Sequence, residues 1–242
     1  MIESTANEPA FDRLLQKAVE VFAEYGFRDA TVREICSRAN VNVASVNYYF
    51  RSKEALYNQA VAFAFREVNR LYPQNAALDT SLPPEQRLGL FIDNFLHKLL
   101  DDSHLGLHSK LITREISDPT SALDEVIASS IAPQCALLEE IIMLVLGAHV
   151  DTGEAENKNS FVSNPLPSPL PEGEGAKTIV HRCILSILGQ CLMFKHSRSV
   201  IDRLYPELIS DASAIQDSAR HITQFSLAAL KSLAQSLSSN AP

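Results

Sequence analysis

The sequence lacks the patterns that define several large classes of enzyme, metalloprotein and membrane protein. Its seven His and four Cys residues show no paired spacing of the kind that a zinc ribbon or a disulfide framework needs. It has no Gly-rich phosphate loop, no Gly-x-Ser-x-Gly elbow and no Cys/His pair in a known catalytic arrangement. The longest apolar run, Ile141 to Ala148, is far too short to span a bilayer. We therefore expect a protein that is neither an enzyme nor membrane-bound, and that holds no cofactor and no metal.

One pair of histidines has a spacing that can suit a metal ion. His104 and His108 are four residues apart, with Asp101 and Glu115 nearby. No third ligand follows at a diagnostic spacing, and the pair straddles Gly106, where a helix is only starting. We interpret both residues as surface histidines.

Composition and the first residues indicate a soluble, reduced protein. Hydrophobic residues make up 46% and charged residues 21%, which is ordinary for a globular chain. The first ten residues are mostly polar and carry Glu3 and Glu8, without a basic residue or an apolar run. Cys183 and Cys191 can share one helix face, where core thiols are the simpler interpretation. We expect a cytoplasmic location.

What the sequence does contain is a pattern for two short helices joined by a tight turn, within residues 31–57. Thr31 can cap the first helix, and Glu34 at the third position can complete a capping box. An apolar stripe at helical spacing follows and then breaks at Asn40. Asparagine is one of the few non-glycine residues that tolerate the left-handed conformation of such a turn.

The second of these helices, residues 43–50, has too few apolar residues to be a core element. Asn42 can cap it. Three of its residues can anchor it, namely Val46, Tyr49 and Phe50. The others are small, polar or aromatic, and they point elsewhere: Ala44, Ser45, Asn47 and Tyr48. Such a face suits the reading of a DNA groove, where hydroxyls and amides meet base edges and phosphates.

The run VNVASVNYYFRSKEALY resembles the recognition-helix signature of the TetR/AcrR family of bacterial transcriptional regulators. The match continues upstream through Ala18, Phe22, Gly26, Thr31 and Ile35, and it covers roughly residues 11–57; Asn40 departs from the glycine of many relatives. The resemblance implies a DNA-binding surface that contains Arg28, Thr31, Arg33, Val43, Ala44, Ser45, Asn47, Tyr48, Tyr49 and Lys53.

The net charge of −8 is unevenly distributed along the chain. Residues 1–72 hold nine basic and nine acidic residues, so the whole negative charge belongs to the remainder. Residues 28–53 hold five basic residues against Asp29 and Glu34. Local charge sets phosphate affinity, because each neutralised phosphate releases counterions. Alone this would indicate only a solvated surface; together with the helix-turn-helix pattern it favours DNA binding.

Apolar periodicity predicts helices along most of the remaining chain, and hence an all-α fold. We expect helices at about residues 9–25, 53–72, 85–102, 106–116, 121–146, 177–196 and 211–237. Pro133 should kink or split the fifth of these. The predicted organisation is a three-helix DNA-binding domain at 1–57 with a linking helix to about 72, followed by a larger helical ligand-binding and dimerisation domain at 73–242.

Residues 151–176 interrupt this pattern with four prolines, two glycines and little apolar content between 164 and 175. Such a segment cannot bury enough surface to offset its ordering entropy. We predict a disordered loop, and a proline-rich ligand for a partner protein is the alternative.

The family resemblance implies a homodimer that pairs its last two long helices and binds double-stranded DNA at a palindromic operator. Residues 113–124 and 198–206 are similar to the C-terminal domain of the CecR-type branch. A small-molecule effector would bind in the larger domain and lower DNA affinity, as expected of a repressor. The candidate effector contacts are Phe91, Phe95, Leu99, Leu111, Arg114, Leu138 and Ile142. For the apolar residues among them, packing in the core is an equally good interpretation. The alternative is an all-α enzyme or carrier that retains an unused helix-turn-helix.

Overall fold

The computed structural model describes residues 10–101, 106–147 and 174–239 of the 242-residue chain. These residues form helices and connecting segments, with no strand among them, as predicted. Residues 151–173 of the predicted loop lie outside the described residues, as does His104. The helices group into two compact units, one comprising residues up to 72 and 101–133, the other residues 73–100 and those from 134 onward.

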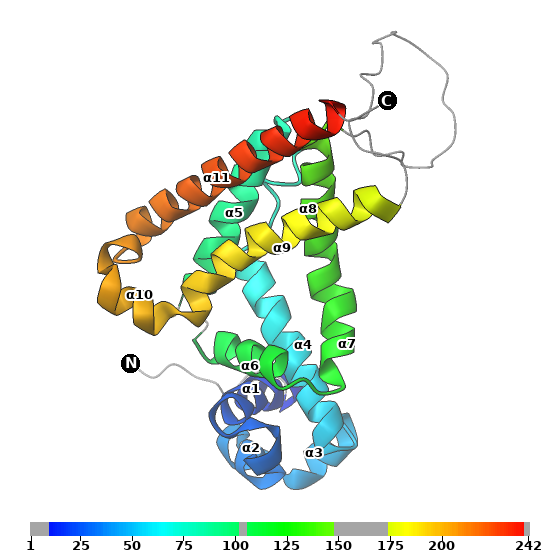
Figure 1. Cartoon of the computed structure of the whole chain (residues 1–242). Helices are drawn as coiled ribbons and strands as arrows, with labels where there is room; N and C mark the ends of the chain where they lie inside the picture. Colours follow the sequence, from blue (N-terminus) through cyan, green and yellow to red (C-terminus); the bar gives the residue numbers. More distant parts are fainter. Residues whose placement is uncertain (1–9, 102–105, 148–173, 240–242) are drawn as a thin grey trace. The chain divides into compact units, whose positions relative to one another are not determined.

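The first unit contains the helix-turn-helix. Helices α1, α2 and α3 form a compact group against α4, and α6 packs across α1 and α4 (Figure 1). Its elements are α1 (Ala10–Asp29), α2 (Val32–Ala39), α3 (Val43–Tyr49), α4 (Lys53–Leu71), α6 (Gly106–Ser117), α7 (Ala122–Val126) and a π-helical turn, η2 (Ile127–Ile131).

A single hydrophobic core holds this unit together. Phe22 of α1, Ile35 of α2 and Leu56 of α4 are completely buried in it. Leu111 of α6 and Val126 of α7 belong to the same core. Helices α6 and α7 therefore pack with α1, α2 and α4, although they follow α4 in sequence. The boundary predicted between the DNA-binding and ligand-binding domains, at residues 72 and 73, stays a sequence prediction. The two compact units are defined by packing and not by function.

Gly26 interrupts α1 at the place where the sequence predicts its end. Its φ of 77° and ψ of 176° lie in a region that side chains with a Cβ rarely enter. A Cβ there would also collide with Nη1 of Arg114 from α6. Gly26 is thus required twice, for the chain reversal that leads into α2 and for the close approach of Arg114.

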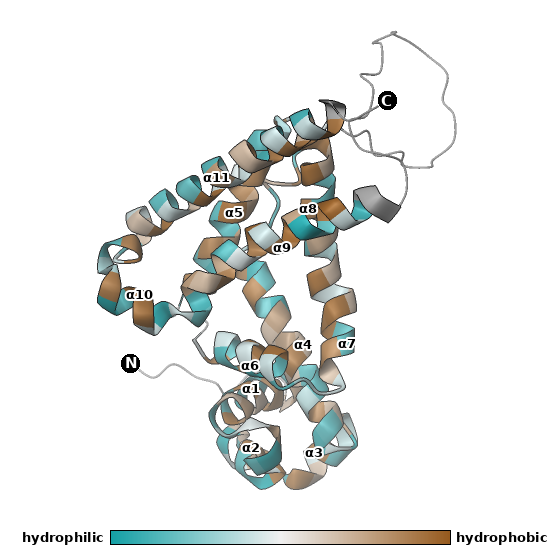
Figure 2. Ribbon diagram, in the orientation of Figure 1, coloured by the Kyte–Doolittle hydropathy of each residue, from teal (hydrophilic) through white to brown (hydrophobic). Residues whose placement is uncertain are grey.

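The second unit is a bundle around a second core. Leu88 and Ile92 of α5 and Leu138 of α8 are completely buried there, beside Val180 and Cys191 of α9. Helix α8 is hydrophobic over most of its length (Figure 2). The elements are α5 (Pro84–Leu100), α8 (Ala132–Val145), α9 (Glu174–His196), α10 (Arg198–Leu204), a 3-10 turn, η3 (Pro206–Leu208), and α11 (Ala212–Ser239).

Pro133 interrupts its helix as predicted. The chain runs from α7 through the π-helical turn of residues 127–131 and resumes regular α-helix at Ala132. Proline lacks the N–H that an α-helix needs and clashes with the carbonyl four residues earlier, so the preceding turn widens. Helix α10 was not predicted, and α9 begins three residues earlier than expected.

Arg87 of α5 is a buried charged residue of the second unit, with a side chain that is only 2% exposed. Its Nε donates to the carbonyl of Ala77 at 2.8 Å, and its Nη2 donates to Oε1 of Glu140 at 2.9 Å. The guanidinium therefore ties the segment before α5 to α8.

We expect Arg87→Ala to destabilise the protein by about 3 kcal/mol, because it leaves a cavity and a buried carbonyl without a donor. The matched control is Arg220→Ala on α11, which removes an ion pair with Asp217 whose partners are 61% and 63% exposed. That control should stay within about 0.5 kcal/mol of wild type. Urea unfolding at one fixed protein concentration measures both, and equal effects would contradict the anchoring role.

Candidate nucleic-acid interface

The turn between α2 and α3 is held by the hydrogen bonds that the sequence predicts, with one exception. Oγ1 of Thr31 accepts from the N–H of Glu34 at 3.1 Å. Asn40 is left-handed, with φ 52° and ψ 51°, and its N–H caps α2 on Ser37 O. Oδ1 of Asn42 accepts from the N–H of Ala44 at 2.9 Å and caps α3.

The exception is the second half of the capping box. The carboxylate of Glu34 does not return to the N–H of Thr31; its Oε1 accepts from Nε of Arg38 at 2.8 Å instead. Arg38 also pairs with Glu24 of α1 at 2.9 Å. The two carboxylates raise the pKa of the Arg38 guanidinium, first through their hydrogen bonds. Arg38, counted in the local positive charge, is therefore neutralised within the first unit.

Two of the three predicted anchors of α3, Val46 and Phe50, are buried, whereas the third, Tyr49, is 41% exposed. Val46 is 1% exposed and Phe50 is 5% exposed. Phe11 of α1 stacks on Phe50 with ring centroids 5.2 Å apart and meets the ring of Tyr49 edge-on at 5.7 Å. This aromatic cluster fixes the rotation of α3 about its own axis.

With that rotation fixed, the other side of α3 faces solvent. Tyr48 is 81% exposed and meets the ring of Tyr49 edge-on at 5.0 Å. The remaining predicted residues of α3 are exposed or half-exposed: Val43, Ala44, Ser45 and Asn47. Five side chains that the sequence proposes as DNA contacts thus share one open face of a short, rigidly anchored helix.

The predicted cations differ in their surroundings. Arg33 is exposed and, within the part of the chain that the structure describes, forms no ion pair. Nζ of Lys53 donates to the carbonyl of Arg28 at 3.1 Å and lies 4.9 Å from the ring centroid of Phe27. An ammonium has three donors, so Lys53 keeps others for a phosphate. The Arg28 side chain lines a cavity with Arg114 and Asp118.

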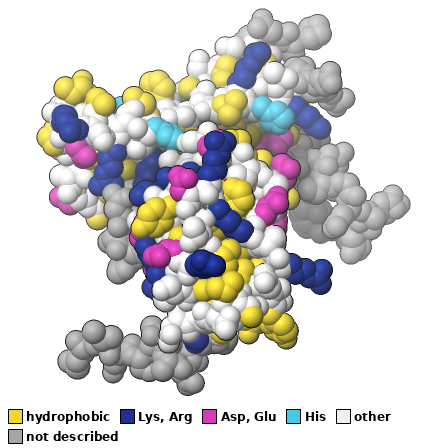
Figure 3. Space-filling model, turned by 90° about the horizontal axis from the view of Figure 1, so that it is seen from below, with side chains coloured by type: hydrophobic (Ala, Val, Ile, Leu, Met, Phe, Trp, Pro, Cys, Tyr) yellow, Lys and Arg dark blue, Asp and Glu magenta, His cyan; other side chains and the backbone are white. Residues whose placement is uncertain are grey.

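On the face that Figure 3 shows, the Lys and Arg side chains of the described residues do not form one continuous basic surface. They are scattered over this face, with acidic and hydrophobic side chains among them. Phosphate attraction would come from separate contacts around α3, as the local charge count suggests.

The candidate effector contacts divide between the two units. Leu111 is fully buried in the first core, while Phe91, Leu138 and Ile142 are fully buried in the second. Phe95 and Leu99 are half-buried on α5, where Phe95 stacks on Phe91 with centroids 5.9 Å apart. Arg114 lines the cavity of the first unit.

Lys98 is a candidate that the sequence did not reveal. It lies on the same face of α5 as Phe95, with Nζ 5.9 Å from that ring centroid. Nζ also donates to Oε1 of Gln134 on α8 at 3.2 Å. Burial lowers the pKa of Lys98 to about 8. Only the packing of α5 on α8 identifies it, because nothing in the local sequence distinguishes this lysine from a solvated one.

The groups weighed as metal ligands have other partners. Tyr72 donates to Oδ2 of Asp101 at 2.7 Å, and Tyr57 donates to Oε2 of Glu115 at 2.7 Å. The ring of His108 packs beside Phe63, 6.0 Å between centroids, and burial lowers the pKa of this histidine. Among the described residues, no group of three metal-binding side chains occurs.

Two family profiles match the chain. The profile "Bacterial regulatory proteins, tetR family" matches residues 14–60, which contain the helix-turn-helix. The profile "HTH-type transcriptional dual regulator CecR, C-terminal domain" matches residues 84–230, more than half of the chain.

Individual relatives agree with these profiles. The HTH-type transcriptional dual regulator CecR of Shigella flexneri is 33% identical over 144 residues, 56% of this chain and 64% of that protein. The probable HTH-type transcriptional regulator YttP of Bacillus subtilis is 26% identical over 157 residues, 64% of this chain and 69% of that protein. The structure of the Bacillus subtilis regulator FadR with stearoyl-CoA shares the fold, with a TM-score of 0.57 and 16% identity over 90% of this chain and 97% of FadR.

Proposed function

This chain belongs to the TetR family of bacterial transcriptional regulators, with a C-terminal domain of the CecR type, and we propose that it is a homodimeric repressor released from a palindromic operator by a small molecule. The observation that carries the proposal is the exposed face of α3, with Tyr48 and Asn47 held outward by the buried anchors Val46 and Phe50. A helix of this kind can enter the major groove while capped turns and nearby cations meet phosphates.

The dimer in this proposal is supported by an unpartnered apolar face on the last two long helices. Leu185 and Met193 of α9 are 70% and 56% exposed, and Phe225 of α11 is 62% exposed. Gly189 lies between the two α9 residues and permits close approach of a second helix. Exposed apolar surface of this kind marks an interaction site. A two-fold pair would place two recognition helices about one DNA turn apart.

A second copy is a better cover for α9 than a lipid bilayer. Residues 177–196, like residues 122–145, are long and apolar enough to cross a membrane by length and composition. However, Val180 and Cys191 of α9 are packed in the core of the second unit, and Nε2 of Gln190 donates to Oγ of Ser226 on α11. We therefore propose a cytoplasmic protein without membrane contact.

The proposed effector has an apolar body and an acidic group. Phe95 and Leu99 offer half-buried apolar surface on α5, and the amine of Lys98 lies 5.9 Å from the Phe95 ring centroid and donates to Gln134. The acyl-CoA in the FadR structure is one ligand of this chemistry. The effector would bind more tightly to a conformation of the protein that spans the operator poorly. DNA affinity would then fall to the extent that the effector prefers this conformation over the DNA-binding one.

The first experiment is a selection of genomic fragments, including the region upstream of the gene, with purified protein, followed by footprinting at moderate salt. A protected palindrome would support the regulator and supply the operator for effector screening. Weak, salt-sensitive binding without sequence preference would contradict it, once a refolded sample has excluded a co-purified inducer. That result would favour the alternative, an all-α enzyme or carrier with an unused helix-turn-helix.

Two variants separate base reading from phosphate contact. Asn47→Ala should lose about 1–3 kcal/mol of discrimination at particular bases of the operator. Lys53→Met should instead weaken binding to all DNA by roughly threefold to tenfold and reduce the salt slope by about one. Fluorescence anisotropy with operator and scrambled duplexes at several salt concentrations distinguishes the two patterns.

The control is Lys231→Met on α11, whose 59% exposed side chain lies 3.6 Å from Glu85 in the second unit. It removes the same charge from the protein without altering α3 or its flanks. If Lys231→Met changed DNA affinity as much as Lys53→Met, the effect would come from total charge and our placement of the interface would be wrong.

A further inference from the structure

The first unit contains a cavity whose lining includes only one of the predicted DNA contacts, Arg28. It has a volume of about 320 Å³ and lies where the end of α1 meets α6 and the segment after it. Ligand pockets span about 300–1,000 Å³, so this one suits a small metabolite. All of its lining residues belong to the first unit, which makes it distinct from the α5 surface around Lys98.

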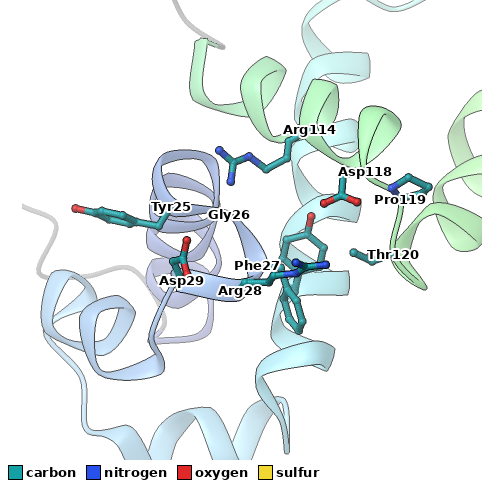
Figure 4. A pocket seen from close by; sticks show the side chains of 10 residues that line it. Tyr25, Gly26, Phe27, Arg28, Asp29, Arg114, Asp118, Pro119 and Thr120 are labelled. Atoms are coloured by element: carbon teal, nitrogen blue, oxygen red, sulfur yellow. The ribbon is translucent and has the colours of Figure 1, made fainter.

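Four charged side chains surround this cavity, two of each sign. Arg28 and Asp29 come from the end of α1, whereas Arg114 and Asp118 come from α6 and the residue just after it. In the close-up of the cavity, Arg114 extends from α6 toward Gly26, whereas Arg28 extends from the end of α1 on the side where Asp118 lies (Figure 4). Within the described parts of the chain, none of the four forms an ion pair. Opposite charges are thus held around one hollow without neutralising one another directly.

The position of Arg114 is built into the backbone. Its guanidinium packs on Gly26, where a Cβ would collide with it and where the positive φ already requires glycine. The next residue, Glu115, is completely buried and fixed by three hydrogen bonds. The base of Arg114 is therefore rigid, and its charged end is directed at the end of α1 rather than left to solvent.

The rest of the lining is aromatic or small. Phe27 and Tyr57, whose ring centroids are 5.0 Å apart, line it, and Pro119 and Thr120 close the side formed by the chain after α6. A guanidinium binds a carboxylate through paired donors, and an aspartate accepts from an ammonium. Aromatic surface can cover the apolar part of the same molecule.

We propose that this cavity binds a free α-amino acid, with its carboxylate on Arg114, its ammonium on Asp118 or Asp29, and its side chain against Phe27 and Tyr57. A zwitterion matches the balanced charges, whereas a simple anion would leave the two aspartates opposed to it. The occupant would contact the segment from Gly26 to Asp29, which leads directly to Thr31, the cap of α2. This site does not depend on the proposed operator or on the effector surface of α5.

The test is calorimetry of the full-length protein with each of the twenty free amino acids, and then with the N-acetyl and the amide derivatives of the strongest ligand. Each derivative lacks one of the two charges. We expect at least one amino acid to bind with micromolar to millimolar affinity and each derivative to bind at least tenfold more weakly. Binding of both derivatives with undiminished affinity, or no binding by any amino acid, would overturn the proposal.

Variants assign the binding to this cavity. Arg114→Met and Asp118→Asn should each weaken binding of the amino acid at least tenfold. The two exposed controls, Arg70→Met and Asp217→Asn, should leave its affinity unchanged. Thermal unfolding of each variant shows whether it is folded. Full affinity in both cavity variants would exclude this site. Operator binding is measured without amino acid, so a failed operator search and a failed ligand titration are separate results.

Discussion

Phe225→Asp is expected to convert the protein from a dimer to a monomer and to lower operator affinity by roughly 10²–10⁴-fold, the range by which linking two binding modules raises affinity. Phe225 is exposed on α11, and its ring is tilted against that of His221, 6.4 Å between centroids. In a dimer through α9 and α11 the carboxylate would be buried without a partner, which costs several kcal/mol. A monomer would engage only one half of a palindrome.

Sedimentation at micromolar concentration measures the assembly, and anisotropy with full and half operators measures the DNA affinity. Gln216→Asp is the control, because nine residues along an α-helix place it on the opposite side of α11, where it is exposed. It should remain dimeric. A dimeric Phe225→Asp protein with unchanged operator affinity would show that the proposed interface is elsewhere.

The helix-turn-helix could be predicted from the sequence because its determinants are local. The predicted caps Thr31 and Asn42 each accept from a backbone N–H two or three residues away, and Ser52 does the same at the start of α4. The left-handed Asn40 and the interruption at Gly26 also follow from residue type. Such features depend on a few neighbouring residues and need no knowledge of how distant helices pack.

The features that the sequence did not reveal depend on contacts between distant segments. Arg38 was counted as a free positive charge, and only the packing of α2 on α1 shows its second ion pair, with Glu24. Arg28 and Arg114 were assigned to separate sites, and the packing of α6 on α1 brings them to one cavity. Lys98 becomes distinctive only through Gln134. Periodicity identifies the buried face of a helix but not its neighbour.

The same packing creates a polar connection between α4 and the turn after α6. Oε2 of Glu115 accepts from the Tyr57 hydroxyl at 2.7 Å, and its Oε1 accepts from the N–H and hydroxyl of Thr120 at 2.8 and 3.0 Å. The Glu115 side chain is completely buried. Nearby, Oγ of Ser121 donates to Glu54 of α4 at 3.1 Å. A buried carboxylate is tolerated here because each oxygen has a donor.

Tyr57→Phe should therefore destabilise the protein by about 1–3 kcal/mol at neutral pH, because it leaves one oxygen of a buried carboxylate without a donor. The variant keeps the ring, which meets Phe22 edge-on at 4.9 Å, so the loss reports the hydroxyl alone. Tyr205→Phe in the second unit, where the residue is 54% exposed, is the matched control and should change stability by less than about 0.5 kcal/mol.

The pH dependence of this difference tests the same contact. Burial raises the pKa of Tyr57, and its hydrogen bond to Glu115 raises it further. A group whose pKa is higher in the folded state stabilises the fold fully below its unfolded pKa, about 10 for tyrosine, and loses that contribution as the pH rises. The advantage of wild type over Tyr57→Phe should thus be constant from neutral pH to about 9 and shrink above about 10. Burial also raises the pKa of Tyr72, to about 12, so both the wild type and the variant lose stability at alkaline pH. Melting temperatures from pH 7 to 11 measure the difference between them, and a difference that stayed constant or grew above pH 10 would show that the Tyr57 hydroxyl is not held by Glu115.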